Sequence, residues 1–227
     1  MTIAEWILLG LIIVTVTLLL ISYIKKINLM KKISECLVIP LFAALNVLLL
    51  RSYLPDSLHL IKITITVLSL ISVSTIFIAF EGKKTLRVAG RFLVLAGICC
   101  WIYLYRTIFF IHKVPLWLTI IALAIYFASM IITMVISGKQ RPLFYGLFAL
   151  SFALSAYLNF CSLIFLCFET AGSSVMLFIG TALFVALNAF HFINQARLNF
   201  KHAGVIRYSL LLASQVLIAC SNILMIR

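Results

Sequence analysis

Long apolar stretches separated by short polar segments dominate the pattern along this chain. Eight stretches each continue for about 20 residues, the length that an α-helix needs to cross a bilayer. They are Ile3–Ile24, Cys36–Leu54, Leu58–Phe80, Val88–Ile111, Pro115–Ile136, Leu143–Phe168, Ser173–Ile193 and Ile206–Ile226. Because lipid cannot pair with the backbone, a spanning segment must be a helix or part of a closed barrel. Barrel strands alternate in hydrophobicity, whereas these runs are continuous. We therefore predict an all-α, polytopic integral membrane bundle of about eight transmembrane helices.

The segments between the predicted spans are too short to form another folded unit. We therefore expect a single transmembrane domain over residues 1–227, with neighbouring spans antiparallel. The first run has no basic leading segment and no small-residue cleavage site after it. For this reason we expect a retained helix and not a cleaved signal peptide.

Composition agrees with this membrane class. Apolar residues make up 65% of the chain and charged residues 10%, whereas a soluble domain is nearer half apolar and a quarter charged. A chain of this length cannot cover so much apolar surface with polar side chains. It needs lipid as its solvent.

The chain has a net charge of +13, and the positions of its basic residues predict its orientation in the membrane. Thirteen of the 18 Lys and Arg residues flank the loops after the first, third, fifth and seventh spans. Since basic loops stay in the cytoplasm, we predict that these loops are cytoplasmic and that both termini are not. The expected location is a bacterial inner (plasma) membrane. The basic loops would contact anionic lipid headgroups, and we expect no nucleic-acid partner.

The cysteines, the histidines and the known catalytic motifs give no candidate metal or cofactor. The six Cys and four His form no C-x-x-C or H-x-x-x-H pattern, so we interpret the cysteines as small packing residues. The chain also contains no P-loop, GxGxxG, GxSxG or HExxH motif. We predict no metal and no cofactor, and the sequence makes no prediction of the oligomeric state.

Polar residues inside the apolar runs mark candidate functional positions, because they are costly in hydrocarbon. All five acids fall near span ends or in loops, which argues against a proton relay built on a mid-bilayer carboxylate. The neutral polar residues of the last two runs instead form one face on each helix. These residues are Asn188, His191, Gln195, Tyr208, Gln215 and Asn222. They either bond neighbouring helices together or line a polar cavity for a lipid headgroup or water.

A family resemblance rests on two segments in the last third of the chain. Gly180–Asn188 has the sequence GTALFVALN, and Arg207–Gln215 has the sequence RYSLLLASQ. Both resemble motifs in the seventh and final helices of the YhhN-like lysoplasmalogenase family of eight-span membrane proteins. Pro40 and Tyr103 stand where that family carries a second-helix Lys-Pro pair and the tyrosine of a fourth-helix His-x-x-Tyr motif.

Most ionisable positions of that family differ in this chain. Leu187 and Asn188 replace a Ser-Asp pair, Ile39 replaces the second-helix lysine, and Cys100 replaces the fourth-helix histidine. No acid occurs among Val73–Thr75, where the family's third-helix Gly-Asp pair falls. The packing pattern is therefore kept while the charged groups are absent.

The resemblance implies an ether-bond hydrolase that cleaves the vinyl-ether bond of a lysolipid in an intramembrane pocket. Such chemistry needs a general acid and a group that stabilises a cation. The catalytic candidates are Asn188 and His191, with His191 as the substitute acid. The substrate-binding candidates are Tyr208, Gln215, Tyr103 and Asn222. Because an amide only donates and accepts hydrogen bonds, two alternatives stay open. They are a non-catalytic lipid-binding or structural membrane protein on the same scaffold, and a small transporter. The expected partner is a membrane lipid or lysolipid.

Overall fold

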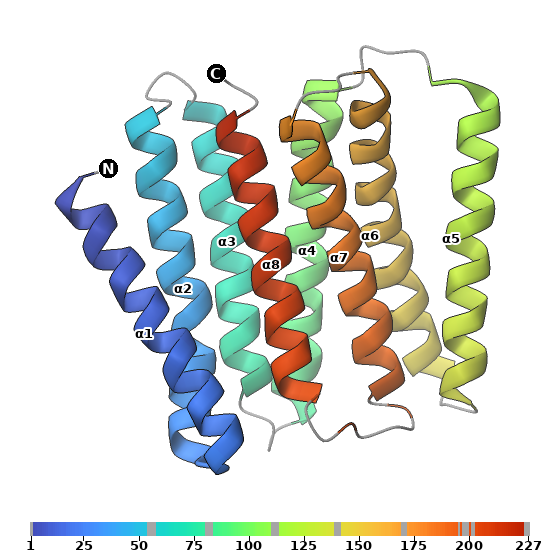
Figure 1. The fold of residues 1–227 in the computed structure, drawn as a ribbon. Coiled ribbons are helices and arrows are strands. Elements are labelled where there is room, and N and C mark those ends of the chain that lie inside the picture. Colours follow the sequence, from blue (N-terminus) through green and yellow to red (C-terminus); the bar gives the residue numbers. More distant parts are fainter. Residues whose placement is uncertain are drawn as a thin grey trace. The chain divides into compact units, whose positions relative to one another are not determined.

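The computed structural model describes residues 2–53, 58–79, 84–109, 114–138, 142–168, 172–194, 196, 200 and 203–224. These described residues form eight α-helices and no strand (Figure 1). The helices are α1 (Ile3–Lys25), α2 (Asn28–Tyr53), α3 (Leu58–Ala79), α4 (Lys84–Phe109), α5 (Leu116–Ser137), α6 (Pro142–Phe168), α7 (Gly172–Ile193) and α8 (Ala203–Leu224). The predicted all-α membrane bundle is thereby confirmed.

Seven of the helices in the described part of the chain are long and apolar enough to cross a membrane. The eighth helix, α3, has 22 residues and is apolar over Ile61–Ser74, the longest continuous stretch whose side chains are described. The observed helix ends lie within about four residues of the predicted ones, except that α2 starts eight residues before Cys36. Neither proline nor glycine interrupts that early part of α2. Lys26, with a φ of 55°, turns the chain from α1 almost directly into α2.

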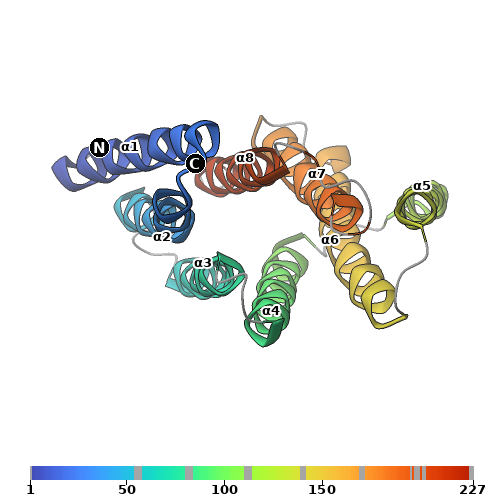
Figure 2. The same cartoon turned by 90° about the horizontal axis from the view of Figure 1, so that it is seen from below.

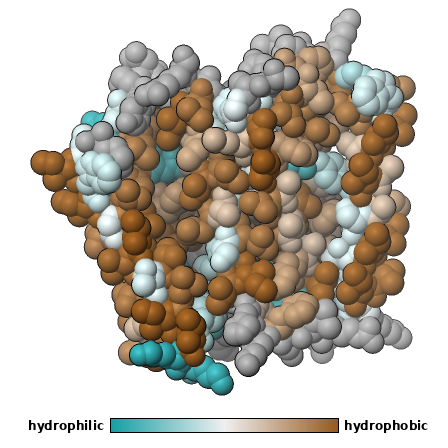
Figure 3. All heavy atoms as spheres, in the orientation of Figure 1, coloured by the Kyte–Doolittle hydropathy of each residue, from teal (hydrophilic) through white to brown (hydrophobic). Residues whose placement is uncertain are grey.

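The described helices gather into two compact units that divide within α4, between Leu104 and Tyr105. In the first unit α2 packs against both α1 and α3, and Gly97 of α4 lies against Ile71 of α3. In the second unit α7 packs between α6 and α8, and α5 contacts α6 and α7 (Figures 1 and 2). Hydrophobic residues cover most of the face in Figure 3, as expected where lipid is the solvent. The single domain expected from the sequence stays a prediction.

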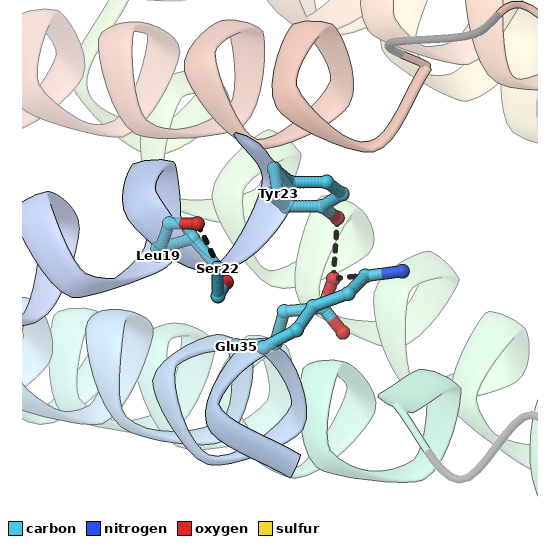
Figure 4. A network of polar contacts seen from close by, with 5 residues as sticks. Leu19, Ser22, Tyr23 and Glu35 are labelled. Carbon is cyan, nitrogen blue, oxygen red and sulfur yellow. Dashed lines mark hydrogen bonds and ion pairs between the residues drawn. The ribbon is translucent and has the colours of Figure 1, made fainter. Parts of the chain in front are cut away.

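Two carboxylates tie α1 to α2, one toward each end of this helix pair. Glu5 accepts hydrogen bonds from the Thr2 backbone N–H at 2.7 Å and from the Ser52 hydroxyl at 2.8 Å. Glu35 accepts one from the Tyr23 hydroxyl at 2.5 Å (Figure 4). Both acids are buried, at 1% and 2% exposure. The sequence placed them near span ends, whereas the structure shows that they are enclosed between the two helices.

A polar network joins α5, α6 and α7 in the second unit. The Asn159 amide accepts a hydrogen bond from the Tyr126 hydroxyl at 2.5 Å and donates to the Thr181 hydroxyl at 2.8 Å. It also donates to the Phe178 carbonyl, and Ser162 bonds to Thr181. Both ends of the Asn159 amide are therefore used. This network fits the interpretation of such residues as hydrogen-bond links between helices.

The contact between α7 and α8 depends on a glycine. A Cβ atom added to Gly180 would lie 3.0 Å from Leu217 Cβ and 3.1 Å from the Ser214 carbonyl oxygen. A second contact joins the same two helices, because the Ser173 carbonyl accepts a hydrogen bond from the Ser221 hydroxyl. Ser173 precedes Gly180 by seven residues in α7, and Ser221 follows Ser214 by seven residues in α8. These two points fix an antiparallel register, and the missing side chain lets the helices approach closely.

Candidate functional site

The polar face of α8 is buried along its length. Tyr208, Gln215 and Asn222 are all buried, and their spacing by seven places them on one face. The hydroxyl of Tyr105, in α4, donates a 2.8 Å hydrogen bond to the Asn222 side-chain oxygen. The Asn222 side-chain nitrogen has no partner among the described residues.

The polar face of α8, formed by Tyr208, Gln215 and Asn222, does not point toward α7. The α7 helix meets α8 at Ser214, Leu217 and Ile218, which surround Gly180. Ser214 immediately precedes Gln215, so it points about 100° away from the polar face. The polar residues of the two helices therefore do not form two facing walls.

Asn188 and His191 lie in the last two turns of α7, and both are half-buried. Asn188 follows Thr181 by seven residues, so it shares the side of α7 that bonds to α6. His191 follows Gly180 by eleven residues, which is about three turns, and shares the side toward α8. Asn188 and His191 thus occupy adjoining edges of the same helix end.

The register between α7 and α8 shows which residues can share a ligand. Eight residues beyond Gly180, Asn188 reaches about the height of Arg207 and Tyr208, because α8 runs in the opposite direction. Asn222 lies 14 residues from Tyr208, or about 21 Å along the helix axis. A single small headgroup cannot contact both ends. By height, the candidate site therefore narrows to Asn188, His191, Arg207 and Tyr208, although Asn188 lies on the α6 side of α7 and Tyr208 on a face of α8 that does not oppose α7.

Other residues proposed from the sequence lie elsewhere. Gln215 is near mid-helix, close to the height of Gly180, and Asn222 lies near the far end of α8. Tyr103 belongs to the first compact unit and is 57% exposed. Gln195 lies outside the described residues. Roles for these residues in substrate binding stay predictions.

Two features that sequence reasoning missed support the narrowed site. The Arg207 guanidinium lies over the Tyr208 ring, 4.9 Å from its centroid, in a cation–π contact that helps to orient the charge. Beyond α7, the Asn194 side chain accepts a 2.9 Å hydrogen bond from the Phe200 backbone N–H. The Phe200 ring also stacks on Phe190. The sequence signals were an Arg-Tyr pair at the start of a helix and aromatic residues on both sides of a connection.

The chemistry of this site is that of hydrogen-bond donors without a carboxylate. The Asn188 side-chain nitrogen is buried and has no partner among the described residues. Arg207 adds a positive charge at the same height, and Tyr208 a hydroxyl group. The described residues between Tyr105 and Leu224 include no Asp or Glu. Such a set suits an anion rich in acceptor oxygens.

The described residues also contain no group of three or more His, Cys, Asp or Glu side chains placed to hold a metal ion. The chain matches no family model, no curated protein and no solved structure.

Proposed function

We propose that this chain is a non-catalytic, lipid-binding membrane protein. In this proposal, the end of α7 and the start of α8 bind the phosphate of a phospholipid or lysophospholipid headgroup. The observation that carries it is the buried Asn188 side-chain nitrogen, which has no partner among the described residues and lies at about the height of the Arg207 guanidinium.

The physical argument concerns the unused donor. A buried polar group without a partner costs about 1–3 kcal/mol, so a donor at this position favours a ligand that brings an acceptor. A phosphate oxygen accepts strong, charge-assisted hydrogen bonds from an amide and from a guanidinium. Arg207, held over Tyr208, lies at the appropriate height. The acyl chains would lie along the apolar exterior of the helices.

Among the described residues no acid lies near this site, which favours binding over hydrolysis. Vinyl-ether cleavage needs a proton donor and a stabilising anion, and His191 is the one candidate acid among the site residues. The two acids in the described part of the chain, Glu5 and Glu35, lie in the first unit and bond to Ser52 and Tyr23. The resemblance to the YhhN-like family supports a lipid-binding scaffold in which the acidic positions have been replaced.

The charge distribution supports the location. We place the chain in a bacterial inner membrane with both termini outside the cytoplasm. The start of α8 then faces the cytoplasm, because Arg207 belongs to one of the basic loop regions. A reporter that is active only in the cytoplasm, fused after Arg227, is expected to be inactive. An active fusion would refute this orientation.

Lipid analysis of the purified protein tests the proposal. Protein extracted in a mild detergent is expected to carry a phosphate-bearing lipid, detected by native mass spectrometry. Asn188→Leu should reduce its occupancy at a fixed lipid concentration by about tenfold, as expected for the loss of a charge-assisted hydrogen bond. Asn46→Leu, in α2, is the matched control because it also removes a buried amide with an unpartnered atom.

Two outcomes would overturn the proposal. Equal lipid retention by the Asn188→Leu and Asn46→Leu variants would remove the assigned site. Release of an aldehyde from a lysoplasmalogen by the purified protein, lost in His191→Ala, would show that the chain is a hydrolase.

A further inference from the structure

The connected ends of α1 and α2 form a compact basic tip. Only Lys26 and Ile27 separate the two helices. Lys25, Lys26 and Lys32 are all exposed there. Figure 3 shows the corresponding hydrophilic patch at the lower left, where these two helices meet in Figure 1.

Exposed apolar side chains are interleaved with these lysines. Ile24 is 79% exposed and Leu29 72% exposed, and Ile27 and Ile33 are also exposed. A tip facing only water would gain nothing from these side chains. Lysines mixed with exposed apolar residues are typical of segments that lie at the boundary between headgroups and acyl chains.

The fourth lysine of this region turns inward. The Lys31 ammonium lies 4.0 Å from a Glu35 carboxylate oxygen and 4.8 Å from the centre of the Tyr23 ring. The same carboxylate oxygen accepts a hydrogen bond from the Tyr23 hydroxyl (Figure 4). One lysine therefore balances the buried acid and helps to hold α1 against α2. The other three lysines carry the positive charge of the tip outward.

We propose that the tip, Ile24–Ile33, binds the anionic phospholipid headgroups of the membrane surface. Its apolar side chains would enter the layer below the headgroups, and its three outward lysines would attract the lipid phosphates. Charge complementarity supports this partner, since anionic leaflets attract juxtamembrane lysines. The inference concerns the first compact unit and does not rest on the function proposed for α7 and α8.

Fluorescence quenching at the tip tests this inference. The full-length Leu29→Trp variant is reconstituted into vesicles of phosphatidylcholine mixed with phosphatidylglycerol, with bromines on the acyl chains of one lipid or the other. The fluorescence of the new tryptophan is obtained by subtracting the fluorescence of the wild-type protein from that of the variant. We expect stronger quenching when the anionic lipid carries the bromines. Replacing Lys25, Lys26 and Lys32 by Gln should lower this preference by about threefold or more.

A matched control removes the same number of charges elsewhere. Arg51→Gln, Lys62→Gln and Arg106→Gln change three exposed cations outside the tip, and this triple variant should keep the preference. An equal loss in both triple variants, or no loss in the tip variant, would overturn the inference. If the tip variant does not fold, salt supplies the test on Leu29→Trp alone. Screening at about 1 M salt should abolish the preference, and a preference that persists there would also overturn the inference.

Discussion

Replacing Gly180 by alanine tests the closest contact between α7 and α8. The added Cβ would lie 3.0 Å from Ile218 Cγ1 and Leu217 Cβ, and 3.1 Å from the Ser214 carbonyl oxygen. One of these neighbours is backbone and another is a Cβ atom, so neither can rotate away. The two helices must separate to admit the methyl group.

The expected magnitude follows from two opposing effects. Alanine stabilises a helix over glycine by about 1 kcal/mol, whereas overpacking a close contact costs about 1–3 kcal/mol. Gly146 in α6 provides the control, because a Cβ there would have no neighbour within 4 Å. Helix propensity is the same in both variants and cancels. Gly180→Ala should therefore be less stable than Gly146→Ala by about 1–3 kcal/mol.

Unfolding in mixed micelles measures this difference. The fraction of SDS is raised while helicity is followed by circular dichroism, and the two variants are compared. Gly97→Ala should behave like the control, since its nearest neighbour, Ile71 Cγ1, lies at an ordinary 3.4 Å. Equal stability of the Gly180 and Gly146 variants would refute the close contact. It would also remove the register that places Asn188 at the height of Tyr208.

The remaining predictions concern the polar links between helices, and the same unfolding assay measures all of them. Asn159→Leu should lower the free energy of unfolding by about 1–2 kcal/mol because three helices lose their shared partner. Ser129→Ala is the control and should change the free energy of unfolding by less than about 0.5 kcal/mol, because the Ser129 hydroxyl donates to carbonyls of its own helix. An equal loss of stability in the Asn159 and Ser129 variants would contradict the role of the network. Tyr23→Phe should cost about 1–3 kcal/mol, since it removes the hydrogen bond that the Tyr23 hydroxyl donates to the buried carboxylate of Glu35. Ser52→Ala should cost less, because Glu5 keeps a 2.7 Å hydrogen bond from the Thr2 backbone, whereas the Lys31 ammonium lies 4.0 Å from Glu35; the reverse order would contradict this reasoning.

The helices could be predicted from the sequence because lipid imposes a simple pattern. Long apolar runs mark the stretch that crosses hydrocarbon, and the observed helices cover most of each run. The start of α2 could not be found in this way, because hydropathy reports burial in lipid and not helicity. Lys31, Lys32 and Glu35 made the segment look like a loop, although nothing in it breaks a helix.

The environment of Glu35 was missed for a related reason. Its partner Tyr23 lies 12 residues away on another helix, and no local pattern links the two. An acid near a predicted span end looks exposed until the neighbouring helix is placed. The close approach at Gly180 had a sequence signal, since small residues favour close contact between membrane helices, but the signal does not name the partner helix.

The candidate site shows the same limit of sequence reasoning. Spacing by seven correctly groups Tyr208, Gln215 and Asn222 on one buried face. That spacing does not say which neighbour the face meets. The answer came from Ser214 and Leu217, which contact α7 and turn the polar face away from it. Only the packed structure separates Asn222 from the end of the hairpin that holds Asn188.

The asparagines of this chain differ in whether their side chains are fully hydrogen-bonded within the protein. This difference separates an asparagine that links helices from one that can bind a ligand. Asn159 uses its oxygen and both of its N–H donors within the protein, so it has no unused donor and serves to link helices. Asn46, Asn188 and Asn222 each keep one buried side-chain atom without a partner in the described part of the chain. Of these, Asn188 is the one with an unused donor at the height of a guanidinium, Arg207. An unused donor at the same height as a positive charge favours an anion, which is why the proposed headgroup site lies there and not at the more deeply buried amides.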